Sequence, residues 1–590
     1  MIWRRKKQPS DDIRPAVPCG LDLGGPRTWV VEMEGHKKAA LEVGRNRLLV
    51  AAAVFSLAFL LVGARLVGLV YFTDQGPDRQ ASASAKASHQ AKPVRADILD
   101  RNGQVLATTL PTNSLYANPR QIRDPQLAAE RLAAILKDIS VAELRAKLTA
   151  DRAFVWLKRN ITPRETAAVN GLGIPGLNFQ RENRRFYPYG ALASHAVGYT
   201  SIDNKGIAGM EMAFDDLLRG SDQPVRLSLD LRVQYILADE LSATMEEFQG
   251  IGAAGVVLDA YSGEVLALVS LPTFNPGRPG EASAEARFNR ATLGVYEMGS
   301  VFKIFTTALA LDSNSVTINS GYDTSDPIRV GRFTISDYKP KKRWLSVPEI
   351  FMYSSNIGTV RMAVDSGTDT LKRYFGDLGL LRAISLELPE VGQPMLPTPW
   401  RPISTMTAAY GHGIAVSPMQ TARAVAAVVN GGELPPVTLL KRAEGEIVPR
   451  KRVFSAKTSE QMRWLMRLVV ARGTGRFAKA EGYLVGGKTG TADKLGPDGG
   501  YSDKKRMATF AAAFPMNDPR YVVLAMVDEP KGIKRTFGFA TAGWVAAPVI
   551  SRTVARMAPL LGIKPVSEEE DKSESLLIKA KMSGPVGAAE

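Results

Sequence analysis

The sequence of 590 residues contains one cysteine, Cys19, and only four histidines, which are scattered along the chain. A single cysteine excludes a disulfide within the chain. Without a cluster of cysteine and histidine, a zinc centre is not expected, and we predict neither a metal nor a cofactor. Hydrophobic residues make up 45% and charged residues 23% of the chain. These ordinary globular proportions exclude wholesale disorder, a collagen-like chain and a protein with many membrane spans.

One long apolar run lies near the N-terminus, at residues 48–72, and its first 17 residues contain neither a charge nor a proline. As a helix the run would be about 37 Å long, enough to cross a hydrocarbon core of about 30 Å. A buried core helix rarely stays uncharged over such a length. A cleaved signal peptide has a shorter apolar segment, and the small residues 81–83 that could be cleaved lie well beyond the run. We therefore predict a retained transmembrane helix.

The charges on either side of the run predict its orientation. Residues 1–47 hold ten Lys/Arg and six Asp/Glu, whereas the first charged residue after the run is Asp74. By the positive-inside rule, residues 1–47 form a cytoplasmic tail. The chain that follows a linker at 73–93 then lies on the opposite side of the membrane. Most of the net charge of +16 then lies outside the cytoplasm. There an anionic envelope polymer or a membrane surface is a better partner than nucleic acid, and a solvated basic surface without a partner is the alternative.

Beyond the linker, the sequence predicts two folded domains and a tail. Residues 94–224 hold short strand-like pieces, turn signals and one helical stretch at 126–148, whereas residues 225–562 have a more regular pattern. The last segment, 563–590, is rich in Glu, Lys, Ser and Gly and is expected to be disordered. In the second domain, strand hairpins lie near both ends with helices between them, which predicts an α/β layer fold and not a parallel βαβ series. The expected strands are 255–260, 265–270, 508–514 and 521–527, and the clearest helices are 298–311 and 459–472.

A serine nucleophile needs a base one helical turn away, and Ser-x-x-Lys at the start of a helix provides one. The sequence has three copies of this pattern, beginning at Ser300, Ser336 and Ser502. The second copy is followed at once by Pro340, so a helix cannot carry it, and the third lies in a polar segment predicted to be a loop. Only Ser300 and Lys303 open a helical run. Backbone N–H groups at such a helix start could also bind an oxyanion.

Two further motifs follow in the order that this chemistry requires. Ser354-Ser355-Asn356 is the only Ser-x-Asn of the chain, and Lys488-Thr489-Gly490 is the only Lys-Thr-Gly and continues to Thr491. Gly486 and Gly487 precede it, and glycines beside a strand let a substrate backbone approach the strand edge. Each motif alone is weak. Their ordered occurrence in helix, loop and strand contexts is specific.

On these motifs the chain resembles the class B penicillin-binding proteins, which are serine D,D-transpeptidases of peptidoglycan synthesis. Ala96 stands where the family usually has glycine, and Met298 departs from the commoner proline, which changes a turn and not a catalytic group. The resemblance covers nearly the whole part after the linker and is carried by the following segments: Arg95-Ala-Asp-Ile-Leu-Asp-Arg-Asn-Gly103, Arg185-Phe-Tyr-Pro-Tyr-Gly190, His195-Ala-Val-Gly198, Gly209-Met-Glu211, Ser270-Leu-Pro-Thr-Phe-Asn-Pro276, Gly411-His-Gly-Ile-Ala-Val-Ser-Pro418 and Asp528-Glu-Pro530.

Within this family the division-specific, FtsI-type subgroup is the most similar. That comparison rests on total length, on Tyr296-Glu-Met-Gly-Ser300, and on Ile335-Ser-Asp337 before Tyr353-Ser-Ser-Asn-Ile-Gly358. The resemblance implies a transpeptidase domain at 225–562, with a mainly antiparallel sheet flanked by helices. It would stand on an elongated, β-rich pedestal domain at 94–224, behind one N-terminal transmembrane helix.

The resemblance also implies a role for each motif residue. Ser300 would attack the penultimate D-Ala of a stem peptide, Lys303 would be the base, and Ser354 would relay a proton to the leaving amine. Asn356 would hold the substrate amide and Lys303. Burial and the nearby charge of Lys488 would depress the pKa of Lys303, because the base must be neutral. Together with Lys488, three residues would bind the substrate: Thr489, Gly490 and Thr491.

The partners implied are peptidoglycan stem peptides ending in D-Ala-D-Ala, β-lactams, the membrane, an FtsW-type glycosyltransferase and other divisome proteins, but no nucleic acid. Gly63 and Gly68 in the predicted anchor would permit close packing against another helix. The implied location is the bacterial inner membrane, with one span, a cytoplasmic N-terminus and a periplasmic catalytic domain.

Three alternatives remain open from the sequence. An elongation-specific class B enzyme would share the chemistry and differ only in its partners. A β-lactamase or D,D-carboxypeptidase would hydrolyse the acyl-enzyme, and a class A β-lactamase needs a glutamate to activate water. Glu387 and Glu390 fall in the right interval for that glutamate, but their Leu-Pro surroundings do not resemble the loop that carries it in class A β-lactamases. A non-catalytic β-lactam sensor or scaffold is the third alternative, and intact Ser300, Lys303 and Lys488 argue against it.

Overall fold

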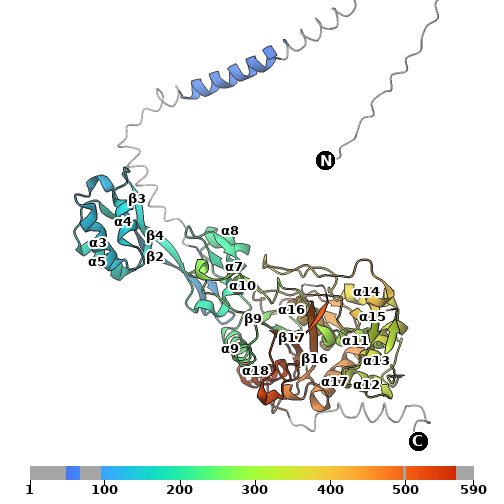
Figure 1. Ribbon diagram of the computed structural model, residues 1–590. Helices are drawn as coiled ribbons and strands as arrows, with labels where there is room; N and C mark the ends of the chain where they lie inside the picture. Colours follow the sequence, from blue (N-terminus) through green and yellow to red (C-terminus); the bar gives the residue numbers. More distant parts are fainter. Residues whose placement is uncertain (1–44, 46–47, 67–94, 332, 496–499, 567–590) are drawn as a thin grey trace, which may run out of the picture. The chain divides into compact units, whose positions relative to one another are not determined.

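The structure is a computed structural model that describes residue 45 and residues 48–66, 95–331, 333–495 and 500–566 (Figure 1). The chain divides into two compact units, residues 1–92 and residues 93–590. In the first unit, the helix Leu48–Leu66 has a mean hydropathy of 2.2 and is long and apolar enough to cross a membrane. Residues 67–72 of the predicted anchor, the linker 73–93, nearly all of the predicted cytoplasmic tail and most of the predicted C-terminal tail lie outside the described residues.

The second unit is built around an antiparallel sheet of five strands in the order β16-β17-β18-β8-β9. The sequence pattern predicted the two hairpins that contribute four of these strands. The predicted 508–514 strand is longer in the structure, because β17 begins at Tyr501 and includes Ser502 and Lys505, which were expected in a loop. The five strands are β8 (Gly252–Asp259), β9 (Val265–Leu271), β16 (Gly486–Leu495), β17 (Tyr501–Phe514) and β18 (Tyr521–Asp528).

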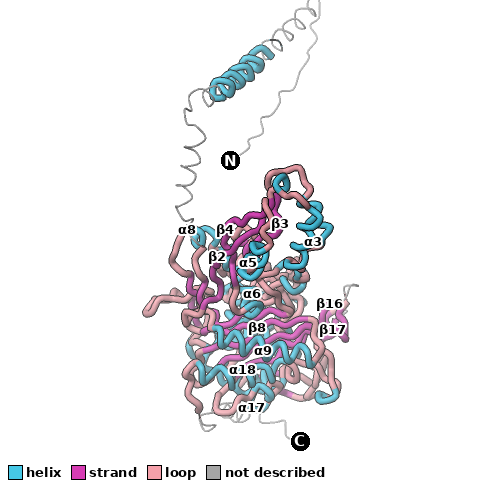
Figure 2. The backbone as a smooth tube through the Cα atoms, turned by 90° about the vertical axis from the view of Figure 1, so that its left-hand side faces the viewer, coloured by secondary structure: helices cyan, strands magenta, loops and turns pink. Residues whose placement is uncertain are grey.

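Helices cover both faces of this sheet, so its central strands are apolar on both sides. In β18, Val522 and Met526 belong to the hydrophobic core that contains α11, α16 and α17. Successive residues of a strand point to opposite faces, so Val523, next to Val522, packs on the other face with α9 and α18. Figure 2 shows α9 and α18 side by side against the strands. The helices of these two layers are α9 (Leu231–Glu247), α11 (Lys303–Asp312), α16 (Pro418–Val429), α17 (Ala456–Arg472) and α18 (Ala546–Leu560).

The helices begin where the sequence supplies an N-cap. Ser417 accepts a hydrogen bond from the backbone N–H of Gln420, and Pro418 occupies the first helical position of α16, where its missing N–H costs nothing. Ser455 caps α17 in the same way. The remaining helices of this part are α10 (Ala284–Arg287), α12 (Val347–Tyr353), α13 (Asn356–Ser366), α14 (Thr368–Asp377) and α15 (Pro402–Ala408). Its small ladders are β10 (Gly321–Asp323) with β13 (Trp344–Ser346), β11 (Ile328–Val330) with β12 (Phe333–Ile335), and β14 (Glu433–Leu434) with β15 (Lys451–Arg452).

The pedestal is organised by one long strand, β2, which pairs with β1, β3 and β4. The single helix predicted at 126–148 is two helices in the structure, because Ser140 caps the second one and so interrupts the first pattern. With α5 they enclose a separate hydrophobic core. The pedestal strands are β1 (Ile98–Leu99), β2 (Val105–Ala117), β3 (Val155–Ile161), β4 (Leu177–Phe186), β5 (Tyr199–Thr200), β6 (Gly206–Ala208) and β7 (Val225–Arg226). Its helices are α3 (Pro125–Ile135), α4 (Val141–Leu148), α5 (Pro163–Gly171), α6 (Ser194–Val197), α7 (Gly209–Ala213) and α8 (Asp215–Gly220).

A buried ion cluster connects three distant pedestal segments. Glu211 accepts the Nε–H of Arg95 and the Nε–H of Arg185 on its two carboxylate oxygens, each at 2.6 Å. Arg95 also pairs with Asp215 at 2.5 Å. The side chains of Arg95, Arg185 and Glu211 are at most 2% exposed, so each charge depends on the others for compensation. These charges therefore hold the pedestal segments together.

Candidate active site

Ser300 lies in a short 3-10 turn, Gly299–Phe302, that leads directly into α11. The helix predicted at 298–311 is present, but its first turn is the tighter 3-10 form, in which positions i and i+3 eclipse. Ser300 and Lys303 have this spacing. Gly299 adopts φ +53°, and a Cβ there would lie 3.0 Å from the carbonyl oxygen of Thr491. Glycine at this position therefore lets the turn approach strand β16 closely.

Lys303 is almost completely buried, at 1% exposure. Its Nζ donates to the backbone carbonyl of Ser354 at 2.6 Å and to Oδ1 of Asn356 at 2.7 Å. Oγ of Ser354 lies 3.2 Å away. The structure thus brings the first two motifs of the sequence into direct contact through one lysine.

Ser354 joins the two lysines of the site. Its Oγ accepts a hydrogen bond from Nζ of Lys488 at 2.8 Å, while lying 3.2 Å from Nζ of Lys303. Ser354 ends helix α12 with φ +62°, the left-handed region that few residues other than glycine adopt. Such strain persists only where the surroundings enforce it, and it occurs often at functional sites. Here it turns the hydroxyl into the space between the lysines.

Burial gives both lysines unusual pKa values. Desolvation lowers the pKa of Lys303 well below its ordinary value, and the charge of Lys488 lowers it further, although Asp337 acts in the opposite direction. Desolvation alone lowers the pKa of Lys488 to about 7. The charge of Lys488 therefore favours the neutral form of Lys303. This is the direction expected from the sequence for a lysine that acts as a base.

Asp337 positions the Ser354–Asn356 turn, and the sequence analysis gave it no role. Its Oδ1 accepts the backbone N–H of Asn356 at 2.6 Å and that of Ile357 at 3.0 Å. Its Oδ2 accepts the hydroxyl of Ser355 at 2.8 Å. One carboxylate therefore caps the start of α13, where unpaired N–H groups favour negative charge. The partners lie 18 to 20 residues apart in the sequence, so local spacing could not reveal them.

The third motif lies on β16, at the edge of the central sheet. Lys488 points to Ser354, whereas alternation places Thr489 and Thr491 on the other side of the strand. The hydroxyl of Thr489 lies 2.8 Å from that of Thr474, and Oγ1 of Thr491 accepts the backbone N–H of Ala542 at 3.1 Å. All three motifs meet at the contact between β16 and the Ser300 turn.

The glycines of this strand serve internal packing. A Cβ at Gly490 would overlap the carbonyl oxygen of Met298, so glycine lets β16 pack against the Ser300 turn. The sequence pattern predicted that Gly486 and Gly487 let a substrate backbone approach the strand edge. In the structure, a Cβ on these residues would instead collide with Met516 and Phe510, so their lack of a side chain makes room for the core. The predicted substrate contact of Gly490 stays a prediction.

The other candidate residues lie elsewhere or in structural roles. Ser336 lies in the loop after β12, and Ser502 lies on β17, so neither opens a helix with its lysine. Glu387 accepts from Thr438 and Leu439, and Glu390 accepts from the backbone N–H of Gly209. These partners come from other segments than the three motifs. The described residues contain no group of three or more His, Cys, Asp or Glu side chains arranged to hold a metal ion.

Of the histidines that the structure describes, His195 is buried and His412 is partly buried. His195 bonds through Nε2 with the backbone carbonyl of Ala286 at 2.8 Å, and desolvation lowers its pKa to about 4. His412 packs between Tyr410 and Tyr501. Burial lowers its pKa as well. The packing of both histidines is consistent with structural roles.

We expect Asp337→Asn to lower the rate of covalent reaction at Ser300 by about 10²-fold, since small misplacements of reacting groups have costs of that size. The charge of Asp337 raises the pKa of Lys303. The variant should therefore also shift the rising limb of the pH–rate profile to lower pH, an effect that a purely structural role would not produce. Asp323→Asn, an exposed residue at the end of β10, is the control. An unchanged rate and profile in Asp337→Asn would contradict the positioning role.

Two family models match the chain. The model described as the penicillin-binding protein transpeptidase domain matches residues 253–551, and that of the penicillin-binding protein dimerisation domain matches residues 90–239. The chain therefore belongs to the class B penicillin-binding proteins, in which a dimerisation domain precedes a transpeptidase domain. This confirms the family resemblance and the α/β fold class.

Named relatives cover almost the whole chain. A protein of Caulobacter vibrioides named probable peptidoglycan D,D-transpeptidase FtsI is 38% identical over 92% of this chain and 94% of its own length. The FtsI of Escherichia coli K12 is 28% identical over 92% of this chain and 96% of its own. Penicillin-binding protein 3 of Mycobacterium tuberculosis, solved with aztreonam, has the same fold with a TM-score of 0.64 at 23% identity, over 81% of this chain and 98% of that one.

Proposed function

We propose that this protein is a membrane-anchored serine D,D-transpeptidase that cross-links peptidoglycan stem peptides in septal synthesis. The observation that carries the proposal is the contact of three motifs at one point. Ser300 opens α11. Lys303 and Lys488 meet at the hydroxyl of Ser354. The family and the FtsI-named relatives support the same reaction class.

In the first half-reaction, Ser300 attacks the carbonyl of the penultimate D-Ala. Lys303, neutral because of its lowered pKa, accepts the proton of the hydroxyl as the Oγ–C bond forms. The N–H groups of Ser300 and Thr491 bind the oxyanion, a function worth about 2.7–4 kcal/mol per donor. When the peptide bond breaks, the proton passes from Lys303 through the hydroxyl of Ser354 to the leaving amine. D-Ala departs, and the remaining peptide stays on Ser300 as an ester.

The free edge of β16 suits an extended stem peptide, which would pair with the strand as an added β-strand. The hydroxyls of Thr489 and Thr491 bind the terminal carboxylate, and protonated Lys488, on the other side of the strand, attracts it by its charge. Asn356, held by its bond to Lys303, presents its amide to the substrate backbone.

In the second half-reaction, an amine of another stem peptide attacks the ester and forms the cross-link. Hydrolysis, the alternative, needs a base that activates water. Glu387 and Glu390, the two sequence candidates for such a base, are engaged with Thr438 and Gly209. This favours transfer to an amine over a β-lactamase reaction. β-Lactams, as mimics of D-Ala-D-Ala, would acylate Ser300 and remain bound.

The apolar helix Leu48–Leu66 supports anchoring in a membrane. We infer that its N-terminus faces the cytoplasm, because ten Lys/Arg precede it. The catalytic part then lies in the periplasm, beside the inner membrane. Gly63 on this helix would allow close packing with a helix of an FtsW-type glycosyltransferase, and other divisome proteins would be further partners.

Depletion tests the septal assignment. In a strain whose native copy is repressed, we expect cells to grow as filaments, because septal cross-linking fails while elongation continues. The wild-type gene should restore division, and Ser300→Ala should not. Ser502→Ala, which alters another Ser-x-x-Lys copy outside the site, should restore it. Round cells on depletion would assign the protein to elongation instead.

A further inference from the structure

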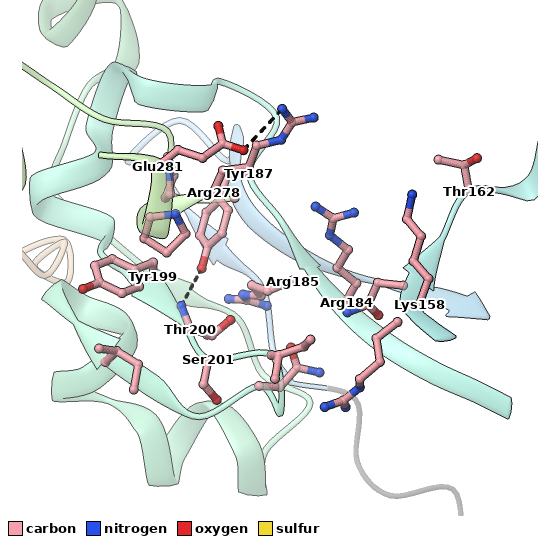
Figure 3. Close-up of a pocket in the computed structure, with 18 of the residues that line it drawn as sticks. Lys158, Thr162, Arg184, Arg185, Tyr187, Tyr199, Thr200, Ser201, Arg278 and Glu281 are labelled. Carbon is pink, nitrogen blue, oxygen red and sulfur yellow. Dashed lines mark hydrogen bonds and ion pairs between the residues drawn. The ribbon is translucent and has the colours of Figure 1, made fainter. Parts of the chain in front are cut away.

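A cavity of about 730 Å³ lies in the pedestal, away from the motif residues (Figure 3). Its walls come from β3, from the end of β4, from the segment 199–207 and from residues 276–281, which follow strand β9. The volume falls in the range of about 300–1,000 Å³ that is typical of small-molecule sites. No step of the proposed reaction uses this cavity.

The lining carries both signs of charge, with cations in excess. Figure 3 shows Lys158, Arg184 and Arg185 together with Arg278 and Glu281 around the space. The five basic residues of the lining are Lys158, Arg159, Arg184, Arg185 and Arg278, and the three acidic ones are Asp138, Glu165 and Glu281. Apolar surface is supplied by Tyr199, Ile202, Ile207, Pro276 and Pro279.

Arg185 has hydrogen-bonding capacity that the protein does not use. It is 3% exposed, and its Nε and Nη1 are bonded to Glu211, to the carbonyl of Arg95 and to Thr109. Its Nη2 is buried and has no partner. A buried guanidinium nitrogen without an acceptor is costly, and such an exception points to an acceptor that is supplied from outside the chain.

Two neighbours extend this donor set. Arg184 is exposed and makes no ion pair or hydrogen bond with the residues that the structure describes. The hydroxyl oxygen of Tyr187 accepts the backbone N–H of Thr200 at 3.1 Å, which leaves its own O–H free to donate. An arginine fork and a phenol beside it suit a carboxylate or a phosphate.

The acidic residues distinguish between these anions. Glu165 and Asp138 form ion pairs with Lys158, at 2.7 Å and 2.6 Å. Glu281 and Arg278 form a longer, exposed ion pair at 3.8 Å. Lys158 already compensates two of these carboxylates, so Glu281 is the wall carboxylate available to the ammonium group of a ligand. Arg184 and Arg185 remain available to carboxylates of the same ligand.

We propose that this cavity is a second, non-catalytic binding site for a peptidoglycan stem peptide that carries carboxylates and a free amine. The proposal rests on the proposed function, because that function places such peptides around the protein. The wall is formed by the pedestal together with residues 276–281, next to the sheet strand β9. A peptide bound there contacts both parts of the unit at once.

The test uses the full chain in detergent after reaction with benzylpenicillin, so that the bound drug blocks the catalytic site. Calorimetric titration with a synthetic stem tripeptide bearing a free side-chain amine should give saturable binding. Arg184→Ala should weaken this binding by about tenfold to a hundredfold, the equivalent of one lost charged hydrogen bond. Arg181→Ala, an exposed residue of the same strand that does not line the cavity, should leave it unchanged.

Two further probes identify the chemistry. The same tripeptide with its amine acetylated should bind more weakly, and inorganic pyrophosphate, as the headgroup of a lipid-linked precursor, should not compete. Tighter binding of pyrophosphate, no binding of the tripeptide, or equal binding by wild type and Arg184→Ala would each overturn the proposal. The acylation step is a separate readout: Arg184→Ala should react with benzylpenicillin as fast as the wild type. Absence of acylation in both would count against the proposed function and not against the second site.

Discussion

Alanine in place of Ser300 is expected to abolish covalent labelling by a fluorescent penicillin, a loss on the order of 10⁶-fold for a serine nucleophile. The reason is chemical, because the variant lacks the oxygen that forms the ester. Ser300 is half-buried at the start of α11 and lies in a 3-10 turn that alanine also adopts. The thermal unfolding midpoint should therefore stay close to that of the wild type. A denaturing gel of isolated membranes provides the measurement.

The sequence itself supplies matched controls for this experiment. Ser336 and Ser502 begin the other two Ser-x-x-Lys patterns, but in the structure they lie in a loop and on a strand. Ser336→Ala and Ser502→Ala should label like the wild type. Labelling that survives in Ser300→Ala, or that disappears in one of the two controls, would assign the nucleophile to another serine.

The second large effect is a bell-shaped dependence of acylation on pH. Lys303 acts as a base only when neutral, so the acylation efficiency of the free protein should rise with pH through the pKa of Lys303, which lies well below 10.5. In the proposed mechanism, Lys488 attracts the substrate carboxylate only when it is charged. Its pKa is about 7, so the efficiency should fall as the pH rises through that value. Stopped-flow acylation at different pH values measures both limbs.

Two variants separate these limbs. Lys303→Met removes the base and should lower the rate by about 10²–10⁴-fold and eliminate the rising limb. Lys488→Arg keeps a positive charge at every pH, because guanidinium does not lose its proton in this range. It should therefore remove the falling limb near pH 7. A falling limb that persists in Lys488→Arg would show that another group controls it.

The three motifs could be found from the sequence because each is local. Ser300 and Lys303 share one turn, Ser354 and Asn356 share one loop end, and Lys488 lies near the start of β16, where alternation separates it from Thr489. Apolar runs in the hairpins likewise predicted the central sheet, since strands that are buried on both faces read as continuous hydrophobic segments. The α/β fold class followed from the order of these elements.

The features that could not be predicted from the sequence depend on contacts between distant residues or on a single helix N-cap. Ser140 splits the helix predicted at 126–148, although the apolar spacing continues on both sides of it. Asp337 reaches the start of α13 from the loop after β12, so its role follows only from the tertiary fold. Gly487 shows the same limit, because its partner, Phe510, lies on the neighbouring strand.

The pedestal cavity was equally inaccessible to sequence reasoning. The pairing of Arg185 with Glu211 gives this side chain a structural role. The unpartnered Nη2 of the same side chain becomes visible only when every donor is assigned an acceptor. The cavity around it also includes residues 276–281, about ninety positions further along the chain.

The most direct test of the central claim is to locate the β-lactam adduct. The full chain should be reacted with benzylpenicillin, digested and analysed by peptide mass spectrometry. We predict one adduct of the mass of the intact drug, held as an ester on Ser300. An adduct on any other residue, or none on folded protein, would contradict the proposal that Ser300, activated by Lys303, is the nucleophile.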